Sequence, residues 1–462
     1  MELRLSEISK LLKCQFDESL DREINGIKID SRNISQGDIF VAIKGETFDG
    51  HDFVSEAFNN GAIACIVEKD LNFDDTSRFL FRVENSIEFM QKIASFYRLK
   101  FDVRVVGITG SVGKTTVKEM LSSIFSFDFN TIKSEGNQNG QIGLPLSIFN
   151  LTRDTQVAVF EMGVSYPGEM KILANIAKPD FAVINNIGMS HVGNFGSLEN
   201  TVREKCDICC ASNCKLFVNA DNVTLSDFFK DKDENIVYFG VGRKSKYRAE
   251  NINFIGDNIT EFLLVTPFLQ KIIRIPCFGM NNVYNALASI AVALDFGMHI
   301  DNIAQGIMNF KPIAMRQRLI KLRNFMLVDD SYNASPDSIR ASINYLSSLK
   351  SDGRCIAVIA DILELGIYTE DVHHELGKYI SSSSIDILIT VGKYSKYINE
   401  GVMVVNPGFN NIHFESNGEA YEYICEILRP GDKILVKGSR GMKADEIVDN
   451  LIKRFGDGIE KS

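Results

Sequence analysis

The chain has 462 residues, of which 45% are hydrophobic, and a formal net charge of −10 at pH 7. This length exceeds one ordinary hydrophobic core, so the composition predicts a globular protein of about two to four domains. The acidic balance, without a block of Lys and Arg or a basic stripe interleaved with aromatic residues, argues against a nucleic-acid partner.

The N-terminal segment, MELRLSEISKLLK, mixes charged residues into its apolar positions and lacks the apolar core of a signal peptide. No apolar run reaches the roughly 18 residues that a membrane span requires. We therefore expect a cytoplasmic protein without a membrane span, and we expect it to be a monomer.

Three sections follow one another along the chain. Residues 1–98 alternate short apolar runs with turn signals, as in IKIDSRNISQGDIFVAIKG, and predict a small α/β domain. Residues 99–311 contain the strand-like runs VRVVGIT, TQVAVFEMG, FAVINNIG and KLFVNAD between helical segments, which predicts a mostly parallel, doubly wound sheet. The pattern restarts over residues 312–462, where FMLVDDSY, RCIAVIAD, IDILITVG and DKILVKGS predict a second, Rossmann-like α/β sheet.

Residues 107–116 read GITGSVGKTT, between a β-branched run and a helical pattern. Such a turn places backbone N–H groups and a helix N-terminus at one point, where phosphates bind. Strict P-loop spacing has glycine at position 108, which is Ile108 here, so a Gly-rich turn without a ligand is the alternative. The loop predicts nucleotide binding and leaves the reaction open. The predicted nucleotide contacts are Gly110, Ser111, Val112, Gly113, Lys114, Thr115 and Thr116.

Two further side chains follow neighbouring strands of this predicted sheet. Glu161 ends the run TQVAVFE, and His191 follows FAVINNIG by a few residues. Both are expected at the carboxyl edge of the sheet beside Thr115, where they would help to hold the Mg²⁺ of a triphosphate. Either residue alone is ordinarily exposed or structurally paired, so the prediction depends on their convergence.

Nine cysteines are spread through the chain, and four of them lie close together in the second section. The odd number and the absence of a secretory signal predict reduced thiols. A structural zinc site pairs two separated knuckles, whereas only one local group is present, so buried apolar side chains are expected. These four are Cys206, Cys209, Cys210 and Cys214.

Polar pairs near later elements complete the candidate site. Asn282 and Asn285 share one face near the start of an apolar helix, where they would either hydrogen-bond an adenine edge or cap the helix. Asp330 closes a strand in DDSYNASPDS, and Lys437 closes another in LVKGSRG. Ordinary turns explain either of these strand ends separately.

Motifs along nearly the whole chain, taken in order, resemble those of the Mur ligases. The first section contributes DSR at residues 30–32, GDIFVAIKG and FDGHDF. The second contributes TGSVGKTT, EMG at residues 161–163, NNIGMSH and NNVYNA. The third contributes DDSYNASPDS, DILELG with His373, and VKGSRGMKADE. The phosphate loop has the TGxxGKT(S/T) spacing of that family.

The resemblance implies an ATP-dependent amide ligase of peptidoglycan precursor synthesis that uses ATP and Mg²⁺. UDP-N-acetylmuramoyl-tripeptide would be phosphorylated on its terminal carboxylate, and the amine of D-alanyl-D-alanine would attack the acyl phosphate. The motif DDSYNASPDS favours this reaction over a sibling ligase that adds the third stem residue or a folylpolyglutamate synthase. A nucleotide-controlled switch or a scaffold is the alternative of another class, and the absence of NKxD argues against a GTPase switch.

The resemblance also implies roles for single residues. Lys114, His191 and Lys205 would be catalytic; Lys205 falls where the family has a lysine that can be carbamylated, and unmodified it would pair with an acidic residue. The metal ligands would be Thr115, Glu161, His191 and Lys205. Asn282, Asn285, Asp330 and either Arg316 or Arg318 would contact ATP. Ser31 would bind the uridine diphosphate, and Asn139, Lys437, Ser439 and Arg440 would contact substrate. Sites on three domains imply that the third domain closes over ATP.

Overall fold

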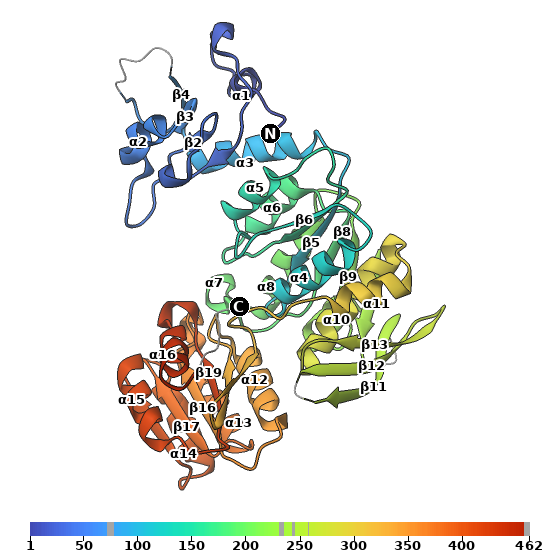
Figure 1. The fold of residues 1–462 in the computed structure, drawn as a ribbon, viewed down its shortest axis with the longest axis vertical. Coiled ribbons are helices and arrows are strands. Elements are labelled where there is room, and N and C mark those ends of the chain that lie inside the picture. The colour runs from blue at the N-terminus through green and yellow to red at the C-terminus, as the bar shows by residue number, and fades with distance from the viewer. Residues whose placement is uncertain (72–77, 231–234, 243–244, 257, 457–462) are drawn as a thin grey trace.

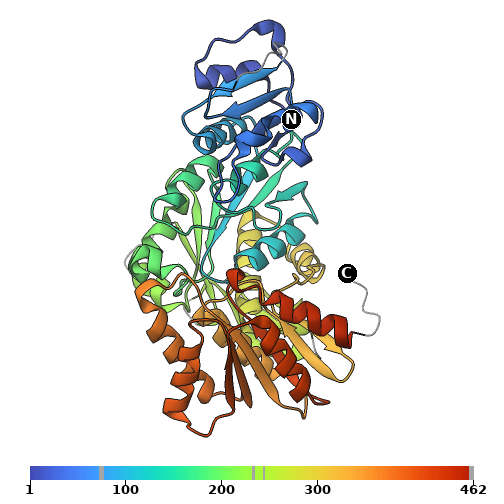
Figure 2. The same ribbon diagram turned by 90° about the vertical axis from the view of Figure 1, so that its left-hand side faces the viewer.

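The computed structural model describes residues 1–71, 78–230, 235–242, 245–256 and 258–456. Its strands form three separate sheets that succeed one another along the chain, each with its own flanking helices (Figure 1). A perpendicular view shows the three parts stacked along the longest axis (Figure 2). The predicted three-domain α/β fold is confirmed, while the exact boundaries at 98/99 and 311/312 stay predictions.

The N-terminal part is built on a small parallel sheet in the order β1-β2-β3-β4. Its middle strands are entirely buried, which matches their apolar sequences. The strands are β1 (Ile27–Lys28), β2 (Ile39–Val41), β3 (Ala64–Val67) and β4 (Phe79–Arg82), and the helices are α1 (Leu5–Leu12), α2 (Val54–Asn59) and α3 (Ser86–Arg98).

The central part is a nine-stranded sheet in the order β13-β12-β11-β10-β9-β8-β5-β7-β6. Strands β5 to β11 pair in parallel, whereas β12 pairs antiparallel with both β11 and β13. Strand β5 lies between β7 and β8, so the chain changes direction across the sheet there, and ligand sites in open α/β sheets lie at such points. The strands are β5 (Arg104–Thr109), β6 (Thr131–Lys133), β7 (Val157–Glu161), β8 (Phe181–Ile184), β9 (Lys215–Asn219), β10 (Ile236–Gly240), β11 (Tyr247–Ile255), β12 (Ile259–Val265) and β13 (Gln270–Ile275).

Helices cover both faces of the parallel portion of this sheet (Figures 1 and 2). Helix α10 packs against α4 and is buried along most of its length, as its run of small and apolar residues predicts. The helices are α4 (Lys114–Phe125), α5 (Gly143–Ile148), α6 (Glu169–Ala177), α7 (Val192–Phe195), α8 (Leu198–Cys206), α9 (Val223–Phe228), α10 (Met280–Phe296) and α11 (Ile300–Met308).

The C-terminal part is a six-stranded sheet in the order β14-β15-β19-β16-β17-β18, parallel except for the β14–β15 hairpin. The strands are β14 (Arg318–Leu322), β15 (Phe325–Asp329), β16 (Cys355–Ala360), β17 (Ile387–Val391), β18 (Asn411–Phe414) and β19 (Lys433–Lys437). The helices are α12 (Pro336–Ser348), α13 (Thr369–Ser381), α14 (Lys396–Val405), α15 (Asn417–Ile427) and α16 (Asp445–Phe455). In the described residues, no helix is long and apolar enough to cross a membrane.

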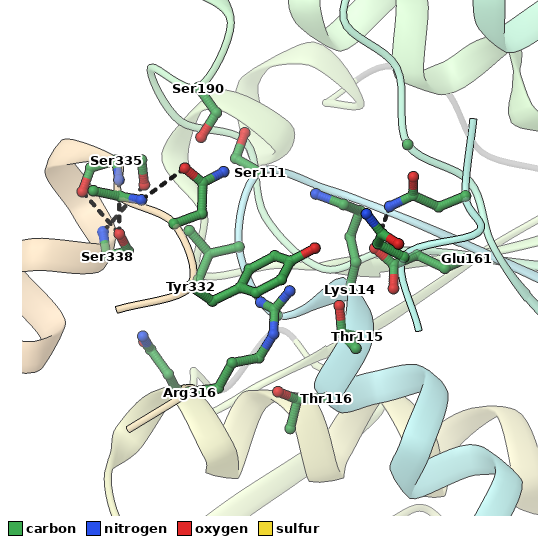
Figure 3. Close-up of a pocket in the computed structure, with 18 of the residues that line it drawn as sticks. Ser111, Lys114, Thr115, Thr116, Glu161, Ser190, Arg316, Tyr332, Ser335 and Ser338 are labelled. Carbon is green, nitrogen blue, oxygen red and sulfur yellow. Dashed lines mark hydrogen bonds between the residues drawn. The ribbon is translucent and has the colours of Figure 1, made fainter. Parts of the chain in front are cut away.

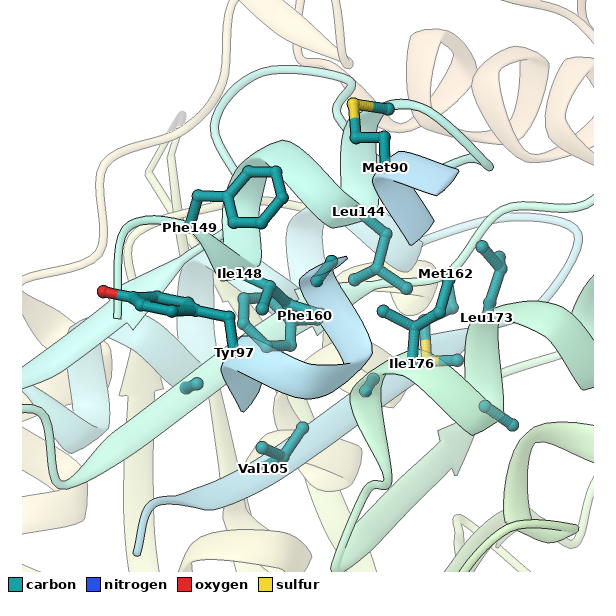
Figure 4. Packing of buried hydrophobic residues seen from close by; sticks show 14 of the residues in the cluster. Met90, Tyr97, Val105, Leu144, Ile148, Phe149, Phe160, Met162, Leu173 and Ile176 are labelled. Carbon is teal, nitrogen blue, oxygen red and sulfur yellow. The ribbon is translucent and has the colours of Figure 1, made fainter. Parts of the chain in front are cut away.

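Helix α3 joins the N-terminal part to the central part through a shared hydrophobic cluster. Met90 and Tyr97 of this helix lie over Leu144, Ile148 and Phe160 of the central part (Figure 4). The buried Tyr97 hydroxyl donates to the carbonyl of Leu151 at 2.9 Å, so the one polar atom of that ring is satisfied.

At the end of α3, the buried guanidinium of Arg98 joins the two parts by polar contacts. It donates to the carbonyls of Ala177, Phe101 and Val103 at 3.0, 3.1 and 3.0 Å. A buried cation that satisfies three carbonyls is costly to remove, because the carbonyls are then left unpaired.

The cysteine cluster differs from its prediction. Cys209 and Cys214 form a disulfide with their Cα atoms 5.3 Å apart, and Cys210 is exposed. The prediction of reduced thiols is therefore wrong for Cys209 and Cys214, and the prediction of burial is wrong for Cys210, which is a free thiol. Helix α8 ends at Cys206 and a short 3₁₀ turn follows, so the chain folds back within bridging distance, which residue counting does not reveal.

Replacing Arg98 by methionine is expected to destabilise the protein by about 3 kcal/mol, since it leaves three buried carbonyls without donors. Denaturant unfolding monitored by circular dichroism measures the change. Arg153 is the matched control, because it also links the two parts but its ion pair with Glu2 is exposed. We expect Arg153→Met to change stability by less than about 1 kcal/mol. Equal effects of the two substitutions would contradict the assignment.

Candidate functional site

A cavity of about 360 Å³ lies where the central and C-terminal parts meet (Figure 3). The phosphate loop, the end of β7, the loop after β8 and the start of α10 line it from the central part. From the C-terminal part it is lined by residues 316–317, 330, 332–335 and 338 and by the end of β19. We call it the interdomain cavity. Parallel strands that end at one sheet edge explain why residues distant in sequence meet there.

The phosphate loop has the backbone geometry that its glycines predict. Gly110 and Gly113 have φ values of +141° and +88°, a region that other residues rarely adopt. The backbone N–H groups of Ser111 and Val112 donate to the carbonyl and the side-chain oxygen of Asn186 at 2.9 and 2.7 Å. The loop is thus held from behind by the segment that follows β8, and Gly113 starts α4.

Gly113 lies where no larger residue fits. A Cβ atom at this position would lie 2.3 Å from Oδ1 of Asn285 and 2.4 Å from Nδ2 of Asn185. These two amides hydrogen-bond to each other at 2.8 Å, and Nδ2 of Asn285 donates to Asn282 at 3.2 Å. Neither α10 asparagine caps that helix, whose N-cap is Gly279 without a side-chain cap. Asn282 and Asn285 line the interdomain cavity, so the capping alternative is wrong.

Lys114 folds back onto its own loop, where its ammonium donates to the carbonyl of Gly110 at 2.8 Å. Desolvation lowers the pKa of this ammonium, Glu161 opposes the shift and Arg316 adds to it. Lys114, Thr115 and Glu161 occupy the same side of the interdomain cavity, opposite Tyr332 and Arg316 (Figure 3). The arrangement offers positive charge to an anion in the space between them.

Glu161 ends β7 with its side chain almost fully buried. One carboxylate oxygen accepts from the amide of Asn139 at 2.9 Å. The other is buried without a hydrogen-bond partner. An unsatisfied carboxylate oxygen beside Thr115 suits a divalent cation, because hard cations prefer such ligands.

Lys118 on α4 holds the segment that carries Asn139. Its side chain is completely buried, and its ammonium donates to the carbonyls of Ser134 and Gly136 at 2.8 and 3.2 Å and lies 3.1 Å from Glu119. This residue was not among the sequence candidates. Its position four residues after Lys114 is the one signal that pointed to it, since i and i+4 share a helix face.

His191 follows β8 and adopts a left-handed backbone conformation, with φ of 58°. Its ring lines the interdomain cavity. The Nδ1 atom is fully buried and lies 2.6 Å from Oε2 of Glu364, and this contact lowers the pKa of the Glu364 carboxyl. Glu364 belongs to the C-terminal part, so the contact crosses the domain interface.

Lys205 is 1% exposed on α8 and does not line the interdomain cavity. Desolvation lowers its pKa to about 7, with the charge of Lys114 contributing. Among the described residues, nothing forms a hydrogen bond or an ion pair with its ammonium. The expected alternative of an acidic partner is therefore not observed. Glu204, the adjacent acid, instead accepts from the backbone of Gly168 and Met170.

The predicted ATP-contacting residues of the C-terminal part differ in whether they line the interdomain cavity. Arg316 lines the interdomain cavity, with its guanidinium 4.3 Å from the centre of the Tyr332 ring. Arg318 lines only a neighbouring cavity of about 220 Å³, which Arg316 and Asn282 also border. The carboxylate of Asp330 is already hydrogen-bonded within the protein. Its Oδ2 atom accepts from both Lys437 and Ser342 at 2.5 Å.

Three predicted substrate residues lie outside the interdomain cavity. Ser31 is in the N-terminal part, where its hydroxyl donates to Glu56 at 2.7 Å. Ser439 accepts from the backbone N–H of Leu363 at 2.9 Å, and Arg440 pairs with Asp445 at 3.1 Å. These contacts are structural. Gly110 also lies outside the lining, whereas the lining includes Asn139 and Lys437.

The described residues contain no group of three His, Cys, Asp or Glu side chains arranged to hold a metal by themselves. Magnesium is commonly bound by one or two protein ligands together with phosphate oxygens and water. Thr115, Glu161 and His191 around one cavity are consistent with that mode.

Comparisons with known proteins identify the family. Models described as Mur ligase family catalytic domain, Mur ligase middle domain and Mur ligase glutamate ligase domain match residues 23–98, 108–293 and 315–440. The UDP-N-acetylmuramoyl-tripeptide–D-alanyl-D-alanine ligase of Bacillus subtilis is 34% identical over 95% of both chains. The Escherichia coli enzyme of the same name is 31% identical over 98% of both.

Solved structures agree with these relatives. A crystal structure of MurF from Acinetobacter baumannii is similar to this chain with a TM-score of 0.88 and 29% identity, and covers 97% of this chain and 98% of that one. MurF ligase from Thermotoga maritima, solved in complex with ADP, gives a TM-score of 0.81 and 27% identity, with 95% of this chain and 99% of that chain covered.

The geometry of Gly113 generates a test with a matched control. Gly168 has nearly the same backbone, with φ of +90° at the start of α6, but a Cβ atom there would meet nothing within 4 Å. Both alanine variants carry the strain of a left-handed residue, and only Gly113→Ala displaces the asparagine amides. We expect Gly113→Ala to weaken binding of an ATP analogue by roughly tenfold or more in calorimetry, and Gly168→Ala to preserve it. Equal losses would show that the asparagine contacts do not matter.

Proposed function

Because this chain belongs to the Mur ligase family, we propose that it joins D-alanyl-D-alanine to UDP-N-acetylmuramoyl-tripeptide, using ATP, in peptidoglycan precursor synthesis. Full-length relatives that bear the name of this ligase carry the assignment. The interdomain cavity supports it, because it combines a phosphate loop, an unsatisfied carboxylate and cationic side chains from two domains.

The resemblance to the Mur ligases implies ATP as the nucleotide, and the Thermotoga maritima MurF ligase was solved in complex with ADP. We assign the phosphates to the loop at residues 110–116, where Lys114 would leave the carbonyl of Gly110 to pair with the outer phosphate oxygens. The adenosine is assigned to the side of the interdomain cavity that Asn282, Asn285 and Arg316 line. Asn282 and Arg316 also border the neighbouring cavity.

Magnesium fits the unsatisfied oxygen of Glu161 and the hydroxyl of Thr115, with His191 as a ligand of a second ion. The metal would supply charge neutralisation between two anions, the peptide carboxylate and the γ-phosphate. Lys114 contributes to the same neutralisation from the loop. Tyr332 and Arg316 close the opposite side of the cavity and help to exclude water, which would otherwise hydrolyse an acyl phosphate before the amine arrives.

Lys205 is proposed to be carbamylated. Its neutral amine would attack carbon dioxide, a nitrogen–carbon bond would form, and the displaced proton would pass to solvent. A buried amine with a pKa of about 7 and no acidic partner is available for this reaction at neutral pH, because a large fraction is deprotonated. The product would convert a costly buried cation into an anion facing Lys114.

The remaining proposed substrate contacts lie partly in the interdomain cavity and partly outside it. Asn139 and Lys437 line the interdomain cavity and lie within reach of a substrate bound there. Ser439 and Arg440 would act through the loops that they hold, and Ser31 would act at a separate uridine diphosphate site in the N-terminal part. The third domain would deliver the dipeptide to the activated carboxylate.

The reaction predicts phosphate release that requires both UDP-N-acetylmuramoyl-tripeptide and D-alanyl-D-alanine. Lys114→Ala is expected to reduce this rate by roughly 10²-fold or more, because it removes a charge that stabilises phosphoryl transfer. Lys171→Ala, on the exposed face of α6, is the control and is expected to keep full activity. Turnover with single amino acids in place of the dipeptide would instead favour a sibling ligase.

Carbamylation predicts a carbamate carbon resonance when the protein is equilibrated with carbon-13 bicarbonate and observed by NMR. We expect the resonance in the wild type and in Lys171→Ala, and its loss in Lys205→Met. A wild-type spectrum without such a resonance at neutral pH would exclude the modification.

A further inference from the structure

Besides the packing of Phe278 against Tyr345, the central and C-terminal parts touch through two short segments beside the interdomain cavity. One is residues 191–196, which contain α7, and the other is residues 364–368, which contain the 3₁₀ turn η5 (Gly366–Tyr368). Val192 is buried in the hydrophobic cluster of the C-terminal part, although it belongs to the central part. We call this contact the α7–η5 contact.

The two segments of the α7–η5 contact approach each other closely through their backbones. The N–H of Gly193 donates to the carbonyl of Glu364 at 3.3 Å, and the hydroxyl of Tyr368 donates to the carbonyl of Gly196 at 3.2 Å. A Cβ atom at Gly193 would lie 2.6 Å from the backbone nitrogen of Gly366. The two glycines thus permit an approach that no other pair of residues would allow.

One side chain from each segment, His191 and Glu364, meets the other at this contact. Both His191 and Glu364 have left-handed backbones, with φ of 58° and 64°, which turn their side chains toward each other. Oε2 of Glu364 lies 2.6 Å from the buried Nδ1 of His191. With Nδ1 covered, Nε2 is the ring nitrogen left for a ligand in the interdomain cavity, which His191 lines.

We propose that Glu364 is a positioning residue that orients His191 for a metal ion only when the two domains are docked. The inference rests on the proposed function, since that function assigns a metal to His191. A histidine that binds a metal is commonly oriented by a carboxylate on its other ring nitrogen, which fixes the ring and its tautomer. Here the carboxylate comes from the other domain. Undocking therefore removes it, and metal binding and docking favour each other reciprocally.

The test measures metal binding and docking directly. Mn²⁺, in place of Mg²⁺, is titrated by electron paramagnetic resonance into the full chain with a non-hydrolysable ATP analogue. His191 is assigned to the second, more weakly bound Mn²⁺ ion. We expect Glu364→Gln to lower the affinity for this ion roughly tenfold. Glu375→Gln is the matched control, since it removes a carboxylate of the same domain whose partner is the exposed Lys378. It is expected to leave binding unchanged.

Two further variants separate orientation from simple destabilisation. The double variant His191→Ala with Glu364→Gln is expected to bind Mn²⁺ no more weakly than His191→Ala alone, because Glu364 acts through the imidazole. Gly193→Ala leaves both side chains in place but blocks the α7–η5 contact. It is expected to expand the protein in small-angle scattering and to weaken the same Mn²⁺ site. Glu364→Gln is expected to unfold at the wild-type denaturant midpoint, because a contact with a half-exposed carboxylate adds little stability.

The outcomes distinguish this inference from the proposed function. If His191→Ala weakens the second Mn²⁺ site and Glu364→Gln does not, the role of Glu364 is overturned and the function stands. If His191→Ala leaves Mn²⁺ binding unchanged, the metal assignment of the proposed function fails and the inference fails with it. Losses that add in the double variant would also overturn the inference.

Discussion

Two lysine ammonium groups that have lost much of their hydration, Lys114 and Lys437, border the interdomain cavity, and the rest of the structure can be understood from that constraint. Desolvation lowers the pKa of both ammonium groups. Lys437 is paired with the carboxylate of Asp330 at 2.5 Å, whereas Lys114 forms no ion pair within the described residues. A cation held away from water without full compensation is costly, so Lys114 favours an anion in the cavity beside it. A ligase that must bring a carboxylate and a triphosphate together requires that positive field.

The fold supplies this field by joining the edges of two sheets. Strands β5, β7 and β8 end at one edge of the central sheet and position Lys114, Glu161 and His191, while β15 and β19 end opposite them and position Asp330 and Lys437. The residues of the site are held in fixed positions because backbone groups and buried polar side chains hydrogen-bond to the segments that carry them. Asn186 holds the phosphate loop, and Lys118 holds the segment of Asn139. Preorganised groups of this kind stabilise charge without reorganising during reaction.

The sequence predicted the parts of the site that follow a single element. Lys114 and Thr115 came from a local motif, and Glu161 and His191 came from the rule that parallel strands end together. The residues that hold the site in place, such as Asn186 and Glu364, were not predicted because their contacts depend on the packing of distant segments. The amino acids around them do not indicate which loop each will contact. The resemblance implied a substrate contact for Ser439, and the structure shows its hydroxyl accepting a hydrogen bond from the backbone N–H of Leu363, a contact that the sequence did not indicate. The disulfide of Cys209 and Cys214 depends on a local turn that residue counting did not indicate.

The way in which the two domains meet also explains how an enclosed site can exchange its substrates. Phe278 packs in the C-terminal hydrophobic cluster beside Tyr345, and the α7–η5 contact adds glycine backbones, the apolar anchor Val192 and the contact between His191 and Glu364. The close approach of the two backbones in the α7–η5 contact admits one arrangement of the domains, whereas the half-exposed carboxylate of Glu364 contributes little stability. With the proposed function, anions bound between the sheets would add attraction between the domains, so occupancy itself would favour the closed arrangement. Release of phosphate would remove that attraction and leave the domains free to separate.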